Sequence, residues 1–275
     1  MKTEERVAGH YTRGKLEEAI LGAARAAGKD TAQLTAGDLA AVDEFHVGGL
    51  EATQMLARGM ELRPGMHLLD VGCGIGGPVR YFAGVEGCQV TGIDLTEEFV
   101  KTAEGLTKLV KLDGRAKFRQ ASALAIPYDA ESFDGGYMIH VGMNLADKGG
   151  AFREVGRVLK PGARFTIFDL VRAKEGALRF PLPWATGEET SFVAEAKEYR
   201  RALESAGFEV VTEKSHLPFA IEFTSRMAAR IRESGPPALG LHILMGEKTG
   251  MMLKNVLDGM VEGVLDVMEI VGKKK

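Results

Sequence analysis

A glycine-rich turn directly after an apolar run constrains this chain more than any other feature. The segment LLDVGCGIGG covers residues 68–77, and Gly72, Gly74 and Gly77 within it have the GxGxxG spacing. Where a strand ends and a helix begins, the first N–H groups of the helix lack partners and carry partial positive charge, so a polar or anionic ligand binds there readily. Glycines let that ligand approach the backbone. The segment therefore predicts a strand, a ligand-binding turn and a helix.

Two carboxylates accompany this turn. Asp94 ends the next apolar run, about 20 residues after Gly72, where nucleotide-binding folds carry the acid that accepts hydrogen bonds from ribose hydroxyls. Asp70 stands two residues before Gly72, where it could accept N–H groups of the turn or meet a ligand ammonium. An adenosine-containing cofactor is the resulting prediction. The alternative is a glycine turn that only lets a strand and a helix pack closely.

From Pro64 onward, short β-branched runs alternate with amphipathic ones, which is typical of βαβ units with crossover helices. The sequence therefore predicts an α/β fold with a mainly parallel sheet flanked by helices. The expected strands cover residues 66–72, 88–95, 116–122, 133–140, 163–170, 208–214 and 265–273.

A single domain over residues 1–275 accounts for the chain, because no repeat or linker divides it. Segment 172–193 contains aromatic residues and prolines without a clear period, and a long irregular stretch of this kind is usually a functional lid or a disordered segment. The predicted parts are an N-terminal helical cap at 1–61, a cofactor-binding core at 62–172, a lid with a helical insertion at 173–264, and a final strand at 265–275.

Composition and charge exclude several classes of protein. A formal net charge of −3 over 275 residues offers no basic face for a nucleic acid. Cys73 and Cys88 are too far apart for a CxxC pair and have no neighbouring histidines, so no metal is predicted. The charged N-terminus does not resemble a signal peptide, and no apolar run is long enough to span a membrane. We expect a cytoplasmic protein with a small-molecule partner, and a homodimer is one option for its oligomeric state.

The chain resembles the class I S-adenosylmethionine-dependent methyltransferases. LLDVGCGIGG resembles the first motif of that family, and three later segments follow the order of the family. They are VTGIDL at 90–95, ASALAIPYDAESFDGGYMIH at 121–140, and FREVGRVLKPGARFTIFD, a helix, a tight turn and a strand, at 152–169. The resemblance covers roughly residues 62–170 and returns in MEIVGKK at 268–274.

This resemblance implies a Rossmann-like sheet of seven strands, mostly parallel with an antiparallel last strand. It also implies S-adenosyl-L-methionine as cofactor, with S-adenosyl-L-homocysteine as product. Gly72 and Gly74 would face the methionine part, and Asp94 the ribose. The full implied cofactor site is Asp70, Gly72, Cys73, Gly74, Asp94, Leu95, Ser122, Ala123, Leu124 and Ile139. Ser122 departs from the family, since many relatives carry an aspartate there for the adenine amino group, and the backbone of Ala123 and Leu124 is the alternative contact.

Two partial resemblances concern the methyl acceptor and point in different directions. DEFHVGG, at residues 43–49, resembles the methyltransferases that act on glycine, sarcosine, dimethylglycine or tocopherols. HVGMNLADK, at 140–148, resembles the ubiquinone and menaquinone ring C-methyltransferases. The implied activity is methyl transfer to nitrogen, oxygen or an activated ring carbon of a small molecule.

Two histidines are the predicted catalytic residues. His140 follows the fourth expected strand at the edge where open α/β sheets bind ligands, and His46 lies in a segment expected to fold over that edge. An amine acceptor needs only to be neutral, but a phenol or a ring carbon must lose a proton, and histidine is the usual base near neutral pH. The alternative for each is a packed or helix-capping histidine.

Aromatic residues are expected around the acceptor, where they could shield the sulfonium by cation–π attraction. The predicted acceptor pocket contains Tyr11, Phe45, Asn144 and Trp184. An adaptable apolar roof is predicted from Phe180, Pro181, Pro183, Trp184, Met245, Met251 and Met252. Ordinary core packing is the alternative for the aromatic and methionine residues.

Two other functions remain open from the sequence. A nicotinamide-dependent oxidoreductase is supported only by the GxGxxG spacing and Asp94, and the chain lacks a recognisable Tyr–Lys or His–Asp hydride-transfer site. A non-catalytic sensor of S-adenosylmethionine is supported by Ser122 and by the absence of a certain base.

Overall fold

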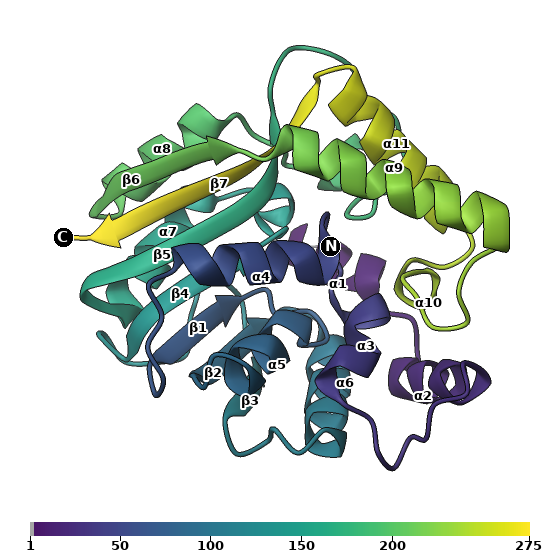
Figure 1. Cartoon of the computed structure of the whole chain (residues 1–275). Coiled ribbons are helices and arrows are strands. Elements are labelled where there is room, and N and C mark those ends of the chain that lie inside the picture. The colour runs from purple at the N-terminus through teal and green to yellow at the C-terminus, as the bar shows by residue number, and fades with distance from the viewer. Residues whose placement is uncertain (1–2) are drawn as a thin grey trace.

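The chain forms one twisted sheet with helices on both faces, as Figure 1 shows for the computed structural model, which describes residues 3–275. The strands are β1 (His67–Val71), β2 (Gln89–Asp94), β3 (Ala116–Gln120), β4 (Phe133–Ile139), β5 (Leu159–Arg172), β6 (Phe208–Ser215) and β7 (Leu265–Lys274). The helices are α1 (Thr3–Tyr11), α2 (Leu16–Ala26), α3 (Ala36–Asp43), α4 (Gly49–Gly59), α5 (Gly77–Gly84), α6 (Glu97–Leu109), α7 (Lys148–Val158), α8 (Ala196–Ser205), α9 (Leu217–Ser234), α10 (His242–Met245) and α11 (Thr249–Val261), with short 3-10 turns η1 (Gly142–Asn144) and η2 (Glu188–Thr190).

The order of the strands places a ligand site between β1 and β4. The seven-stranded sheet has the order β3-β2-β1-β4-β5-β7-β6, and only the pairs that include β7 are antiparallel. The chain therefore leaves β1 in one direction and returns to β4 on its other side. In open α/β sheets, ligands bind at the carboxyl ends of the strands where this reversal occurs. The predicted fold, with its antiparallel last strand, is confirmed.

Alternation along the strands separates two apolar cores. Leu68 and Phe168 belong to a core with α4 and α5, whereas the adjacent Leu69 and Ile167 belong to a core with α7 and α8. Successive strand side chains point to opposite faces, so each core covers one face of the sheet. The helices α1, α9, α10 and α11 gather beyond the carboxyl ends of the parallel strands (Figure 1). Residues of all four helices line the cavity described below.

Two details differ from the sequence prediction. β5 begins at Leu159 instead of Ala163, and the Pro161-Gly162 pair is an irregularity within the strand, with Gly162 at φ +78°. The expected helical insertion is divided into α9, α10 and α11. Gly235, at φ +75°, and the two prolines that follow it end α9, because proline cannot continue a helix.

We expect Gly77→Ala to destabilise the fold. A Cβ at Gly77 would overlap the backbone carbonyl of Asp43, where α3 meets the start of α5, and backbone cannot move aside as a flexible side chain can. Urea unfolding should show a loss of about 1 to 3 kcal/mol. Gly22→Ala is the control, since nothing lies within 4 Å of its added Cβ, and it should change stability by less than about 1 kcal/mol, in the stabilising direction. Equal stabilities of the two variants would contradict the close contact.

Candidate functional site

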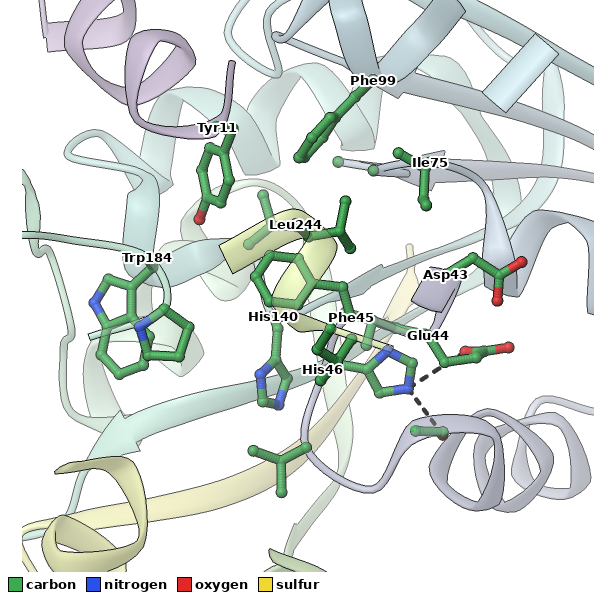
Figure 2. Close-up of a pocket in the computed structure, with 18 of the residues that line it drawn as sticks. Tyr11, Asp43, Glu44, Phe45, His46, Ile75, Phe99, His140, Trp184 and Leu244 are labelled. Carbon is green, nitrogen blue, oxygen red and sulfur yellow. Dashed lines mark hydrogen bonds and ion pairs between the residues drawn. The ribbon is translucent and has the colours of Figure 1, made fainter. Parts of the chain in front are cut away.

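A cavity of about 1520 Å³ opens at the carboxyl ends of β1 and β4. It brings together most of the residues predicted to bind the cofactor or the acceptor, and Figure 2 shows part of its lining. The predicted residues that line it are Tyr11, Phe45, His46, Asp70, Gly72, Cys73, Gly74, Asp94, Leu95, Ala123, Leu124, Ile139, His140, Asn144, Pro183 and Trp184, whereas Phe180 and Pro181 of the predicted roof do not.

The glycines of the turn after β1 differ in the space around them. A Cβ at Gly72 (φ +79°) would overlap Val141, and Gly77 is in contact with the backbone of Asp43, so these two positions serve packing. Gly74, at φ +53°, has no atom within 4 Å of an added Cβ and lines the cavity. The turn therefore offers open backbone to a ligand at Gly74.

Asp94 holds the same turn from the end of β2. Its carboxylate accepts hydrogen bonds from the N–H of Gly74 at 2.9 Å and from the N–H of Thr96 at 2.8 Å. Burial raises the pKa of Asp94, and the N–H donors of Thr96 and Gly74 offset this in part. The carboxylate reaches the cavity, where it can accept further hydrogen bonds from a ligand.

Asp70 is a buried acid without a hydrogen bond at one oxygen. The residue is 2% exposed, and its Oδ2 atom has no partner among the described residues. Burial raises the pKa of Asp70 well above its usual range. The neighbouring Tyr137 hydroxyl offsets this in part, and the charge of Asp94 adds to it. A buried polar atom without a partner is costly. Since Asp70 lines the cavity, a cationic ligand group would satisfy this oxygen.

The sequence analysis missed Arg80, which ties the glycine turn to the cap. Its side chain is fully buried, and Nη2 donates to Asp43 Oδ2 at 2.7 Å and to the carbonyl of Ile75 at 2.7 Å. Nη1 donates to the hydroxyl of Thr107 at 3.0 Å. Arg80 thereby joins α3, the turn and α6. No spacing signal in the sequence pairs it with Asp43.

His46 lies beside Glu44, as Figure 2 shows, and the two form a buried polar group with Thr53. Its Nε2 is 3.0 Å from the carbonyl of Gly49, 3.3 Å from Thr53 Oγ1 and 3.6 Å from Glu44 Oε2. Thr53 donates its hydroxyl to Glu44 at 2.7 Å. Because a carbonyl can only accept, Nε2 carries the proton, and Nδ1 is the ring nitrogen with a free lone pair.

Burial has opposite effects on the two ionisable groups of this cluster. It raises the pKa of Glu44 to about 8, with the charge of Asp43 as the next cause. It lowers the pKa of His46 to about 4, although the Gly49 carbonyl favours the charged ring. Glu44 is thus the group that binds a proton more tightly.

His140 enters the cavity from the end of β4 in a rare conformation. Its φ is +54°, which few non-glycine residues adopt and which often marks functional positions. The ring stacks on Phe168, with centroids 5.7 Å apart, and lies 6.0 Å from the ring of His46. Its Nε2 is buried without a partner in the described part of the chain, and burial lowers its pKa well below the usual range. Both histidines are therefore neutral hydrogen-bonding groups at one end of the cavity.

The predicted pocket residues also meet in the cavity. Tyr11 accepts a hydrogen bond from Asn144 at 2.9 Å, and its ring has edge contacts with Phe45. Burial raises the pKa of the Tyr11 hydroxyl, so it stays protonated. Trp184 is 2% exposed and donates its indole N–H to Ser191 at 3.0 Å. Tyr11 and Trp184 lie on one side of His140 in Figure 2.

Ser122 and the methionine roof lie elsewhere than expected. Ser122 donates its hydroxyl to Glu4, accepts from the N–H of Leu124 at 3.0 Å, and does not line the cavity. The geometry therefore favours the backbone of Ala123 and Leu124 as the adenine contact. Met251 is 55% exposed, and Met245 and Met252 are buried outside the cavity lining. The prediction of a roof from these methionines was wrong, because the cavity-facing sides of the helices are formed by other residues, such as Met227 and Leu253.

No set of His, Cys, Asp and Glu side chains within residues 3–275 is arranged to hold a metal ion, and both cysteines are free and buried. A search of the same residues for a helix long and apolar enough to cross a membrane found none.

Comparison with known proteins gives consistent results. The family described as Methyltransferase domain matches residues 69–167. Cycloartenol-C-24-methyltransferase 1 of Oryza sativa subsp. japonica is 26% identical over 76% of this chain and 68% of that protein. Cycloartenol-C-24-methyltransferase of Arabidopsis thaliana is 32% identical over 58% of this chain, and the match spans only 49% of that protein. The solved geranyl diphosphate C-methyltransferase of Streptomyces coelicolor A3(2) has the same fold, with a TM-score of 0.73, 16% identity, and coverage of 100% and 99% of the two chains.

The sheet is doubly wound, the glycine turn after β1 is open, and an acid stands at the end of the next strand. These features together are typical of proteins that bind a nucleoside cofactor. Residues 69–167 match the methyltransferase domain, and in sequence and fold the chain is similar to class I S-adenosylmethionine-dependent methyltransferases, whose cofactor is S-adenosylmethionine.

We expect Glu44 to make stability pH-dependent. Its pKa is raised from 4.5 to about 8 in the folded protein. Between these pH values unfolding releases the proton, so the contribution of Glu44 to the free energy of unfolding falls as pH rises, by up to about 1.4 kcal/mol per pH unit. In urea unfolding at pH 5 and pH 8, Glu44→Gln should gain stability relative to the wild type as pH rises. Glu104→Gln, at an exposed position, should follow the wild type. A difference between Glu44→Gln and wild type that is constant with pH would contradict a protonated Glu44.

Proposed function

We propose that this protein transfers a methyl group from S-adenosylmethionine to an apolar small molecule, and that cofactor and acceptor share the one cavity. The observation that carries this proposal is the placement of the open Gly74 backbone and the His46–His140 pair in that same cavity. Its volume of about 1520 Å³ exceeds the roughly 300 to 1000 Å³ of a site for one drug-sized ligand.

The residues at the glycine end fit the cofactor. The Asp70 oxygen without a hydrogen bond suits the ammonium group on the methionine part of the cofactor. Gly74 has no side chain, which leaves room for the other atoms of that methionine part. Asp94, Ala123 and Leu124 line the same cavity. Asp94 would accept hydrogen bonds from the ribose hydroxyls, and the backbone of Ala123 and Leu124 would contact the adenine. Together these residues would bind a cationic amino acid, a diol and a flat base along one path.

The cofactor supplies an activated methyl group on a positively charged sulfur. The protein's task is then to hold the acceptor in line with that group, which alone can supply much of the rate acceleration. His46 offers a free Nδ1, and His140 offers a buried Nε2 without a partner. These two neutral rings would orient the acceptor and remove its proton. The aromatic rings of Tyr11 and Phe45 would exclude water and stabilise the positive charge on the sulfur of the cofactor.

Apolar side chains support an apolar acceptor. The lining of the cavity includes the apolar side chains of Phe223, Met227, Leu253 and Val256, together with Trp184. Two relatives are named for methylation of cycloartenol, and the solved neighbour for methylation of geranyl diphosphate. An acceptor with a terpenoid or similar hydrocarbon body suits this lining better than free glycine or sarcosine.

Removal of either proposed acid contact should weaken cofactor binding. By calorimetry, S-adenosylhomocysteine should bind Asp70→Asn and Asp94→Ala about ten- to a hundredfold more weakly than wild type, as expected for a lost hydrogen bond to a charged group. Asp113→Asn, at an exposed position, should bind normally. Titration with NAD is the control for the oxidoreductase alternative. Tight binding of NAD without binding of S-adenosylhomocysteine would overturn the proposal.

Methyl transfer itself is tested with radiolabelled S-adenosylmethionine and an apolar metabolite extract. We expect label in an apolar product, and a large loss of transfer in His46→Asn and His140→Asn without a matching loss of affinity for S-adenosylhomocysteine. A protein that binds the cofactor but labels no acceptor of any class would be a sensor.

A further inference from the structure

A continuous line of polar contacts leads from the cavity to a buried acid. His46 Nε2 lies 3.3 Å from Thr53 Oγ1, and that hydroxyl donates to Glu44 Oε2 at 2.7 Å. All three residues are buried, with Thr53 fully so. The other ring nitrogen, Nδ1, makes no hydrogen bond with the described residues, and His46 lines the cavity.

Among residues 3–275, the contacts of the Glu44 carboxyl compensate its burial only weakly. Its carboxylate oxygen Oε2 accepts one neutral hydroxyl and lies 3.6 Å from the neutral His46. The neighbouring buried acid Asp43, by contrast, is paired with Arg80. A buried carboxyl with so little compensation is costly to the fold. This cost points to a use in the reaction.

From this geometry we propose that Glu44 and Thr53 are positioning residues that take up, through His46, the proton released by the methyl acceptor. The proposal rests on the methyl transfer proposed above. His46 and Glu44 both line the cavity, and we assign the catalytic role to His46 because its Nδ1 has a free lone pair that can accept the proton of the acceptor.

The proposed steps balance in atoms and charge. The bond between the acceptor atom and its hydrogen breaks, the proton goes to His46 Nδ1, and the electron pair forms the new bond to the methyl carbon. The methyl–sulfur bond breaks with its pair left on sulfur. The His46 Nε2–H, which lies between the Gly49 carbonyl at 3.0 Å and Thr53 Oγ1 at 3.3 Å, then passes its proton to Thr53 Oγ1, and the Thr53 hydroxyl proton goes to Glu44. The sulfonium charge and the Glu44 charge disappear together, which avoids a new buried charge.

This transfer of the proton from His46 through Thr53 to Glu44, called the relay below, needs Glu44 ionised at the start of each cycle. Because its pKa is raised to about 8, the active fraction should grow as pH rises through this value. The charged and titratable groups that face Glu44 are Asp43 beside it, Arg80 and Tyr81 on α5, Asp70 on β1, Tyr137 on β4, and His46.

Carbon-13 NMR of glutamate carboxyls tests the resting state without any acceptor. In protein saturated with S-adenosylhomocysteine, one glutamate should titrate near pH 8 and be missing from Glu44→Gln. Thr53→Val should move that titration to higher pH, because the hydroxyl favours the ionised acid. Thr53→Ser, which keeps the hydroxyl, should restore it. A Glu44 that titrates below pH 6, or one that Thr53→Val leaves unchanged, would overturn the relay.

The transfer assay then tests the role in turnover, with radiolabelled S-adenosylmethionine and the apolar extract. Transfer by wild type should rise to a plateau above about pH 8. Thr53→Val should slow transfer about tenfold or more, and Glu44→Gln should remove the rise with pH. Thr53→Ser should retain most of the rate, and all variants should bind S-adenosylhomocysteine like wild type.

The outcomes separate the two proposals. If wild type transfers label and Thr53→Val is equally fast, the relay fails and methyl transfer stands. If wild type transfers no label at any pH, the proposed function fails, whatever the NMR titration shows.

Discussion

The buried guanidinium of Arg80 holds the two ends of the site in one geometry. It donates to the carbonyl of Ile75 in the glycine turn and to Asp43 at the end of α3. The next residues after Asp43 are Glu44, Phe45 and His46, so the segment that carries the acceptor-side groups starts from this ion pair. A buried ion pair with several hydrogen bonds is strongly destabilised when one partner is lost. Arg80 therefore links the glycine turn to the segment that carries His46.

Several acids line the cavity, and burial raises the pKa of four of them, Asp43, Glu44, Asp70 and Asp94. Asp70, Glu44 and Asp94 stand at different points of the lining. A sulfonium compound with an ammonium group brings positive charge into such a place, and the acids would compensate it there. The same low dielectric keeps His46 and His140 neutral, with lowered pKa values. The lining thus favours a cationic cofactor together with an uncharged acceptor group.

The sequence was informative where the signal is local. The strands follow from runs of β-branched residues, and the turn after β1 from glycine spacing, since each depends on neighbours in the chain. His46 and His140 were found because both stand in short segments with a recognisable pattern. The strand ends also predicted the correct edge of the sheet for the site.

What the sequence missed depends on contacts between distant segments. Arg80 meets Asp43, and Tyr11 meets Asn144, only after the cap folds over the sheet. Ser122 is engaged by Glu4 of α1, which no local pattern indicates. The prediction of a methionine roof was wrong for a related reason. Composition indicates an apolar helix, but tertiary packing determines which face of that helix lines the cavity.

A crystal structure with S-adenosylhomocysteine is the most direct test of the claim that one cavity joins cofactor and acceptor. The account predicts the amino-acid end between Asp70 and Gly74, the ribose on Asp94, and the sulfur facing the space before His46 and His140. Bound S-adenosylhomocysteine whose sulfur points away from both histidines, or which lies outside this cavity, would contradict the shared cavity.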